Sequence, residues 1–139
     1  MFRPKLIFCY LFLFFFNISI NAQKTSFKVM AWNILHGGND IENGQENVAK
    51  IIKEINPDII LMVETYGSGP FIADYLNYNF HLIASENTSL NDPSVNLSVF
   101  SKYPFGKRID TKYPFYLGGI EIPINGKIIR FFSNWFHYL

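Results

Sequence analysis

The chain has 139 residues, a length typical of a single domain. Its 12 basic and 11 acidic residues nearly balance, so the composition gives no broad basic surface of the kind that drives non-specific nucleic-acid binding. A single cysteine excludes an intrachain disulfide framework and a zinc–thiolate cluster.

Residues 1–22 have the three parts of a secretory signal peptide. Two basic residues come first, residues 6–16 form an apolar run, and small residues follow as far as Ala22. The run is short for a membrane span, which needs about 20 apolar residues, so an uncleaved anchor is the weaker alternative. We expect cleavage near Ala22 and export to a secreted or periplasmic location. Because two basic residues and Cys9 leave with the peptide, the mature chain would carry ten basic and eleven acidic residues and no cysteine.

The mature chain, residues 23–139, opens with a predicted strand, helix and strand. Residues 27–32 alternate as in a strand, and the chain then passes through a glycine-rich loop. A helix is predicted from residue 45 to Pro57, where the residue before the proline leaves the helical region. Apolar residues recur on one face of this helix: Val48, Ile51, Ile52 and Ile55. Five apolar residues, 59–63, then predict a buried strand parallel to the first one.

The rest of the chain predicts a short helix and several antiparallel strands. The helix covers residues 71–76, and the strands cover residues 80–84, 95–100, 117–124 and 127–135. Asn125-Gly126 between two apolar runs predicts a tight hairpin. The fold class is therefore α+β, with a βαβ opening followed by mostly antiparallel strands.

Two polar side chains mark the carboxyl ends of the two parallel strands. Asn33 ends the first strand and Glu64 ends the second. Carboxyl ends of parallel strands lie at one edge of a sheet, where ligands often bind, so these side chains should be neighbours. A carboxylate there suits a hard cation such as Mg²⁺. The alternative is that Glu64 only begins a loop and faces solvent.

Three stretches resemble motifs of the endonuclease/exonuclease/phosphatase superfamily, which includes deoxyribonuclease I and sphingomyelinases. Residues 28–34 resemble its first strand, which ends in an asparagine after an aromatic residue. Residues 51–65 resemble its second motif, a helix, an Asn-Pro-Asp turn and an apolar strand ending in glutamate. Residues 96–104 resemble a strand that ends in Ser-Lys-Tyr-Pro. The three stretches stand in the family's order, which makes the match far more specific than one motif.

The resemblance implies a divalent-metal-dependent phosphoesterase and the first half of a four-layer αββα sandwich. Glu64 would ligate Mg²⁺, or Mn²⁺ or Ca²⁺, and Asn33 would help to position the metal or the scissile phosphate. The substrate would be a phosphate ester, namely a lipid headgroup, a sugar phosphate or a nucleic acid. We expect no stable membrane span after signal cleavage, and we predict no protein partner.

A phosphate-contacting histidine is also implied, and the sequence allows two alignments for it. The family's strand ends in Asn-Thr-His-Leu-Asp. Anchoring on Asn134, with one inserted residue, makes His137 the catalytic residue. Anchoring on Phe136 and Tyr138 places Trp135 there and needs no insertion, which would turn later side chains to the other face. His36, in the loop after Asn33, either contacts phosphate or is an exposed loop residue.

The family's later motifs, Gly-Asp-Phe-Asn and Ser-Asp-His, do not occur in this sequence. The resemblance therefore covers the first half of the fold and implies a truncated copy with little or no activity alone. We also expect one sheet of the sandwich to be missing, which would leave a bare face and low solubility. The alternative is a secreted, non-catalytic interaction module that keeps the first half of the fold.

Overall fold

The computed structural model describes residues 26–84 and 87–136 as two sheets and three helical segments. The predicted signal peptide and His137 lie outside the described residues. One sheet has the order β1-β2-β4-β3, with β1 (Val29–Asn33), β2 (Ile59–Val63), β3 (Asn79–Leu82) and β4 (Leu97–Ser101). The other has the order β5-β6-β7, with β5 (Arg108–Ile109), β6 (Leu117–Ile124) and β7 (Lys127–Asn134). The helical segments are η1 (His36–Gly38), α2 (Gly44–Ile55) and α3 (Gly69–Leu76).

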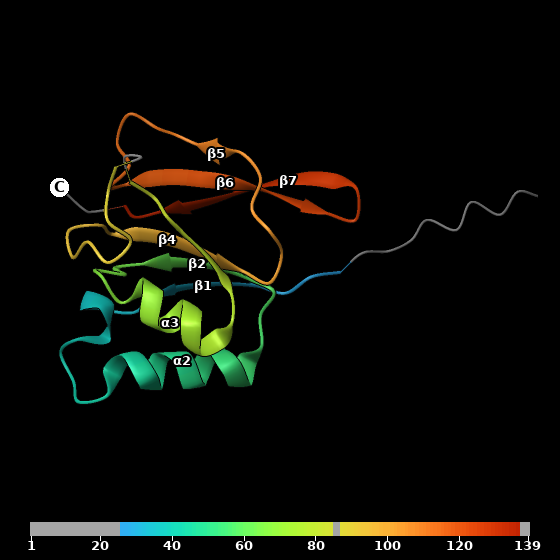
Figure 1. Ribbon diagram of the computed structural model, residues 1–139. Coiled ribbons are helices and arrows are strands. Elements are labelled where there is room, and N and C mark those ends of the chain that lie inside the picture. The colour runs from blue at the N-terminus through green and yellow to red at the C-terminus, as the bar shows by residue number, and fades with distance from the viewer. Residues whose placement is uncertain (1–25, 85–86, 137–139) are drawn as a thin grey trace, which may run out of the picture.

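The elements form three layers (Figure 1). Helices α2 and α3 cover one face of the four-stranded sheet, and the three-stranded sheet covers the other face. Strand β2 supplies side chains to both sides, because neighbouring residues of a strand point to opposite faces. Ile60 and Met62 pack with the helices, whereas Ile59 packs between the sheets. This continuous burial explains why the β2 sequence is apolar at every position.

The predicted βαβ unit is confirmed. Strands β1 and β2 are parallel, with Val29 opposite Ile59 and Asn33 opposite Val63. The predicted hairpin is confirmed as well, since β6 and β7 pair antiparallel around Asn125-Gly126. Both turn residues have positive φ, 48° and 75°, which is the conformation that an Asn-Gly turn favours.

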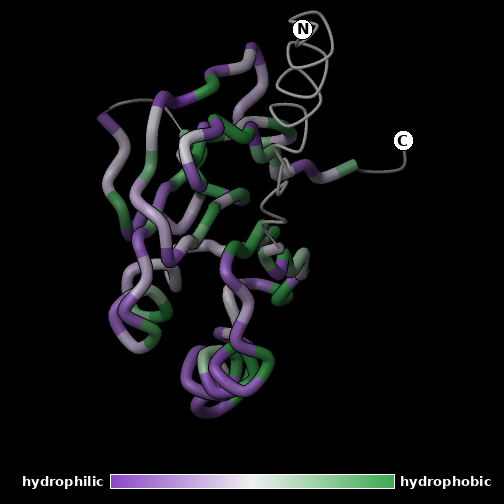
Figure 2. The backbone as a smooth tube through the Cα atoms, turned by 90° about the vertical axis from the view of Figure 1, so that its right-hand side faces the viewer, coloured by the Kyte–Doolittle hydropathy of each residue, from purple (hydrophilic) through white to green (hydrophobic). Residues whose placement is uncertain are grey.

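Helix α2 buries only part of its predicted apolar face. Val48 and Ile52 are buried, but Ile51 and Ile55 are 43% and 41% exposed. Helix α3 lies beside α2, so the buried stripe shifts toward Ala49, whose small side chain allows close packing. Figure 2 shows hydrophobic and hydrophilic residues on opposite sides of α2, the lowest coil. Asn56 does leave the right-handed helical region, but into the left-handed one (φ 51°) rather than an extended conformation.

The expectation that one sheet would be missing is wrong. Strands β6 and β7 pack on β2 and β4, and a shared core of apolar side chains fills the space between the sheets. The Ser133 hydroxyl donates to the Met62 carbonyl oxygen (3.1 Å) and ties the two sheets together. Strand β5 was not predicted, because two residues are too few to show a periodic pattern. The part of the chain that the structure describes contains no helix long and apolar enough to cross a membrane.

Candidate metal-binding site

Asn33 and Glu64 meet at the carboxyl ends of β1 and β2, on the left of Figure 1. The Asn33 side-chain nitrogen donates to Oε1 of Glu64 (2.8 Å). The Asn33 side-chain oxygen accepts from the backbone N–H of Leu35 (2.9 Å), which fixes the orientation of the amide. The predicted proximity of the two side chains is therefore confirmed. A carbonyl oxygen has two lone pairs, so the predicted metal contact of Asn33 is compatible with this geometry and stays a prediction.

The loop after β1 supplies a second donor to the same carboxylate. The backbone N–H of His36 donates to Oε2 of Glu64 (3.1 Å), and the N–H of Gly37 donates to the Glu64 carbonyl oxygen (2.7 Å). This close approach requires glycine at position 37. A Cβ there would lie 2.6 Å from the Thr65 carbonyl oxygen, and the backbone is left-handed (φ 71°). The loop is thus fastened directly to the glutamate.

Of the eight described residues other than glycine that have positive φ, four lie around this carboxylate. Glu64 itself has φ 59°, and Tyr66 has φ 39°. Leu35 and His36, in the facing loop, have φ 51° and 50°. Such conformations cost about 1–2 kcal/mol per residue, and they persist where the surrounding structure holds them, often at functional sites. The edge that carries Asn33 and Glu64 is therefore a region of stored backbone strain.

The electrostatics of the site leave the negative charge of Glu64 unbalanced. Among the described residues, the two hydrogen-bond partners of its carboxylate, the Asn33 amide and the His36 N–H, are neutral. Within residues 26–84 and 87–136, Glu64 forms no ion pair with a basic side chain. A half-buried carboxylate held by neutral donors and facing a sheet edge suits a divalent cation. Burial and, to a lesser degree, the Glu64 charge raise the pKa of Tyr66, whose hydroxyl therefore stays neutral at neutral pH.

The described residues supply few protein ligands to such a cation. They contain no cluster of three or more histidine, cysteine, aspartate or glutamate side chains that could hold a metal. Mg²⁺ commonly binds through one or two carboxylates and keeps several waters, so a single glutamate with a neighbouring amide fits its chemistry. Zinc, which wants three or four nitrogen or sulfur ligands, does not fit this set.

His36 contributes to the site through its backbone. Its ring nitrogen Nδ1 lies 2.7 Å from Oδ2 of Asp40, and both side chains are more than half exposed. The ring centroid lies 6.3 Å from that of Tyr66. Neither sequence alternative anticipated the main-chain donation to Glu64. A loop that leaves the strand with positive φ at residues 35 and 36 gives no signal in the sequence.

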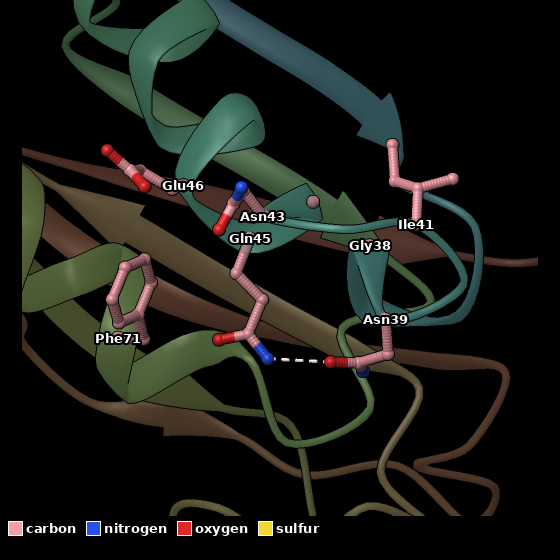
Figure 3. A pocket seen from close by; sticks show the side chains of 8 residues that line it. Gly38, Asn39, Ile41, Asn43, Gln45, Glu46 and Phe71 are labelled. Carbon is pink, nitrogen blue, oxygen red and sulfur yellow. Dashed lines mark hydrogen bonds between the residues drawn. The ribbon is translucent and has the colours of Figure 1, made fainter.

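A hollow of about 340 Å³ lies beside the same loop, at the start of α2. Figure 3 shows Asn39 and Gln45 reaching toward each other across it. Gln45 Nε2 donates to Oδ1 of Asn39 (2.6 Å), and Asn39 Nδ2 donates to the His36 carbonyl oxygen (2.8 Å). These bonds brace the loop that presents the His36 N–H to Glu64.

Of the two candidates for phosphate contact at the end of β7, the structure describes Trp135, and His137 lies outside the described residues. Trp135 follows the last residue of β7 and joins an aromatic cluster. Its ring stacks on Tyr116 at 6.0 Å and meets Phe115 edge-on at 5.5 Å. The catalytic role proposed for His137 therefore stays a prediction.

Comparisons with known proteins agree with this architecture. A sequence model of the endonuclease/exonuclease/phosphatase family matches residues 30–139. An uncharacterized protein of Caenorhabditis elegans is 28% identical over 87 residues, which cover 55% of this chain and 28% of that protein.

Solved structures give a similar result for the fold. Truncated TDP2 of Caenorhabditis elegans superposes with a TM-score of 0.59 at 21% identity, covering 81% of this chain and 47% of that one. TDP2 of Danio rerio in complex with a single-strand DNA product gives 0.57 at 14% identity, covering 78% and 45%. The chain thus spans about half the length of these structures, and less than a third of the curated relative.

Proposed function

The chain belongs to the endonuclease/exonuclease/phosphatase family, and from that premise we propose that it forms the metal-binding part of a divalent-metal-dependent phosphoesterase. Enzymes of this family generally use divalent metal ions. The observation that carries the proposal is the Glu64 carboxylate, held at the strand ends by Asn33 and the His36 N–H and without a basic partner among the described residues.

The residues have separate tasks in this proposal. Glu64 supplies the carboxylate that binds the cation, and Asn33 holds that carboxylate in place and offers its own amide oxygen nearby. The bound cation would polarise a phosphoryl oxygen and offset negative charge. The neutral hydroxyl of Tyr66 is a hydrogen-bond donor for a phosphate oxygen beside Glu64.

We further propose that the 139-residue chain binds metal but hydrolyses phosphate esters slowly or not at all. Among the described residues, Glu64 has no hydrogen bond to a second acidic side chain, and the neighbouring His36–Asp40 pair is more than half exposed. Removing groups that act as a catalytic unit typically costs several orders of magnitude in rate.

The proposed substrate class is a phosphate ester. A relative of the same fold has been solved with a single-strand DNA product, which supports nucleic acid as one member of that class. The near balance of charge does not favour nucleic acid over a lipid headgroup or a sugar phosphate. We propose that the protein is exported, because residues 1–22 have the pattern of a cleaved signal peptide.

Calorimetric titration with Mn²⁺ tests the proposal, together with a Mn²⁺-dependent assay on bis(p-nitrophenyl) phosphate. We expect one binding site in the wild type, loss of binding in Glu64→Gln and negligible hydrolysis in both. Glu64→Gln keeps the shape of the side chain and removes its charge. Equal Mn²⁺ affinity in both proteins would contradict the metal-binding role and favour a non-catalytic interaction module. Rapid hydrolysis by the wild type would contradict the proposed inactivity alone.

A further inference from the structure

We propose that Asn96 is a positioning residue that holds Glu64 in the backbone conformation needed for metal binding. This inference rests on the proposed function, since it assigns a purpose to the strained backbone of the metal-binding glutamate. Asn96 precedes β4, lies next to Glu64 in space and is completely buried.

The pairing of β2 with β4 changes at this point. Val63 lies opposite Leu97, so continuing the register would place Glu64 opposite Asn96. Instead, the backbone N–H groups of both Glu64 and Thr65 donate to Asn96. Glu64 donates to the side-chain oxygen Oδ1 (2.9 Å), and Thr65 donates to the backbone oxygen (2.9 Å). Just past the last strand pair, two consecutive residues that follow β2 therefore donate to the single residue that precedes β4, as in a β-bulge at the end of a ladder.

The extra residue changes the direction of the Glu64 side chain. Bulges are common beside active sites, where they re-aim a side chain. Glu64 takes up the extra residue with a left-handed φ of 59°, and its carboxylate then meets the Asn33 amide and the His36 N–H. The cost of that conformation must be offset by the surroundings, and the bond from the Glu64 N–H to Asn96 does so directly.

Both ends of the Asn96 amide are used. Its nitrogen Nδ2 donates to the Phe115 carbonyl oxygen (3.0 Å), in the segment that leads into β6. The side chain therefore links the glutamate to the aromatic cluster of Phe115, Tyr116 and Trp135 at the edge of the second sheet. Alanine at this position would leave the Glu64 N–H and the Phe115 carbonyl without these partners inside the protein.

Ser98 provides a matched control in the same strand. It is also completely buried, and its hydroxyl lies 2.6 Å from that of Thr65. Ser98→Ala removes one buried hydrogen bond next to the bulge but leaves the Glu64 N–H paired with Asn96. A loss of stability alone should therefore appear in both variants, whereas a loss of metal affinity should appear only when Asn96 changes.

The test is a Mn²⁺ titration followed by electron paramagnetic resonance, with thermal unfolding measured on the same samples. We expect Asn96→Ala to weaken Mn²⁺ binding at least about 10-fold, the usual effect of removing a group that orients a ligand. Ser98→Ala should stay within about 2-fold of the wild type.

The outcomes separate this inference from the proposed function. If Asn96→Ala binds Mn²⁺ as tightly as Ser98→Ala, while Glu64→Gln does not bind it, then the positioning role of Asn96 is wrong and the metal site stands. If Glu64→Gln binds like the wild type, the metal site fails and this inference with it. Should Asn96→Ala not fold, Asn96→Gln replaces it, because one added methylene displaces the accepting oxygen; the same loss of affinity is expected.

Discussion

The two ends of the β1-β2-β4 sheet are built from the same three strands, yet they differ in how their polar groups are used. At the end where β2 begins, Asp58 has a complete set of partners. Its Oδ2 accepts from the backbone N–H of Lys28 (2.8 Å), and its Oδ1 pairs with the Lys102 ammonium group (3.0 Å). Donation from the Lys28 N–H and the proximity of Lys102 hold the pKa of Asp58 below its usual range.

At the opposite end, Glu64 has a left-handed backbone and no basic partner among the described residues. The two acids lie six positions apart in one motif, and both belong to the stretch that resembles the family. One motif therefore contains two kinds of residue, one that stabilises the fold and one that is available to a ligand. Asp58 stabilises the fold through its hydrogen bonds and ion pair, and we call its end of the sheet the closed end. Glu64 keeps its carboxylate available for a ligand at a cost in backbone strain, and we call its end the open end.

The largest expected effect on stability comes from Asp58, at the closed end of the sheet. Asp58→Ala should lower the free energy of unfolding by about 1–2 kcal/mol at neutral pH, because it removes hydrogen bonds to a charged group that joins three strands. Mn²⁺ affinity should not change. Chemical denaturation at several pH values checks this. Since the pKa of Asp58 is lowered by folding, its contribution is present above pH about 4 and is lost as pH falls through the folded pKa, so wild type and variant should converge in acid.

Asn33→Ala should have the converse effect. It removes the amide that holds the Glu64 carboxylate, so we expect Mn²⁺ affinity to fall about 10-fold with little change in the melting temperature. A calorimetric titration measures the first quantity and a thermal scan the second. A large fall in stability with unchanged affinity would instead make Asn33 a structural residue like Asp58.

His81 in β3, near neither end of β2, should give a smaller and purely pH-dependent effect. Burial lowers the pKa of His81 to about 4, and the Arg108 charge contributes. The folded protein then binds fewer protons than the unfolded chain between pH 6.5 and 4, so stability is complete above that window and falls as pH decreases through it. Solvent still reaches the ring, so the loss should be about 1 kcal/mol. His81→Gln, which does not titrate, should lack this slope in a pH series of denaturation curves.

The smallest expected effect on stability is that of Glu64→Gly, which tests whether the Glu64 backbone is strained. Glu64→Gly removes the metal-binding carboxylate but relieves the left-handed conformation, which glycine adopts freely. The two side-chain hydrogen bonds are lost as well, so the free energy of unfolding should stay equal or rise, by less than about 1 kcal/mol. A fall of 2 kcal/mol or more would show that Glu64 stabilises the fold and that the two ends are alike.

Much of the fold, as distinct from the candidate site, was predictable from the sequence. The period of α2, the apolar run of β2 and the Asn125-Gly126 turn are local signals, and each was confirmed because the local preference and the packing agree. The period did not show that Ile51 and Ile55 would stay 43% and 41% exposed, since the position of α3 against α2 is a tertiary property. The second sheet was underestimated because its partnership with β2 and β4 joins residues far apart in sequence.

The candidate site was predictable only in outline. Parallel strands and the positions of Asn33 and Glu64 were enough to predict that the two side chains meet. The His36 N–H and the Asn96 side chain were missed because both act through backbone geometry, namely a left-handed loop and a change of strand register. Neither feature is visible in the amino-acid composition. Asn96 was singled out only as part of a motif.

The most direct test of the central claim is an anomalous diffraction map of crystals of the protein soaked in Mn²⁺. We expect a single strong peak within about 2.5 Å of a Glu64 carboxylate oxygen, at the carboxyl ends of β1 and β2, and no peak there in crystals of Glu64→Gln. A peak that persists in Glu64→Gln, or one found only at exposed acids such as Asp40 and Glu46, would contradict it.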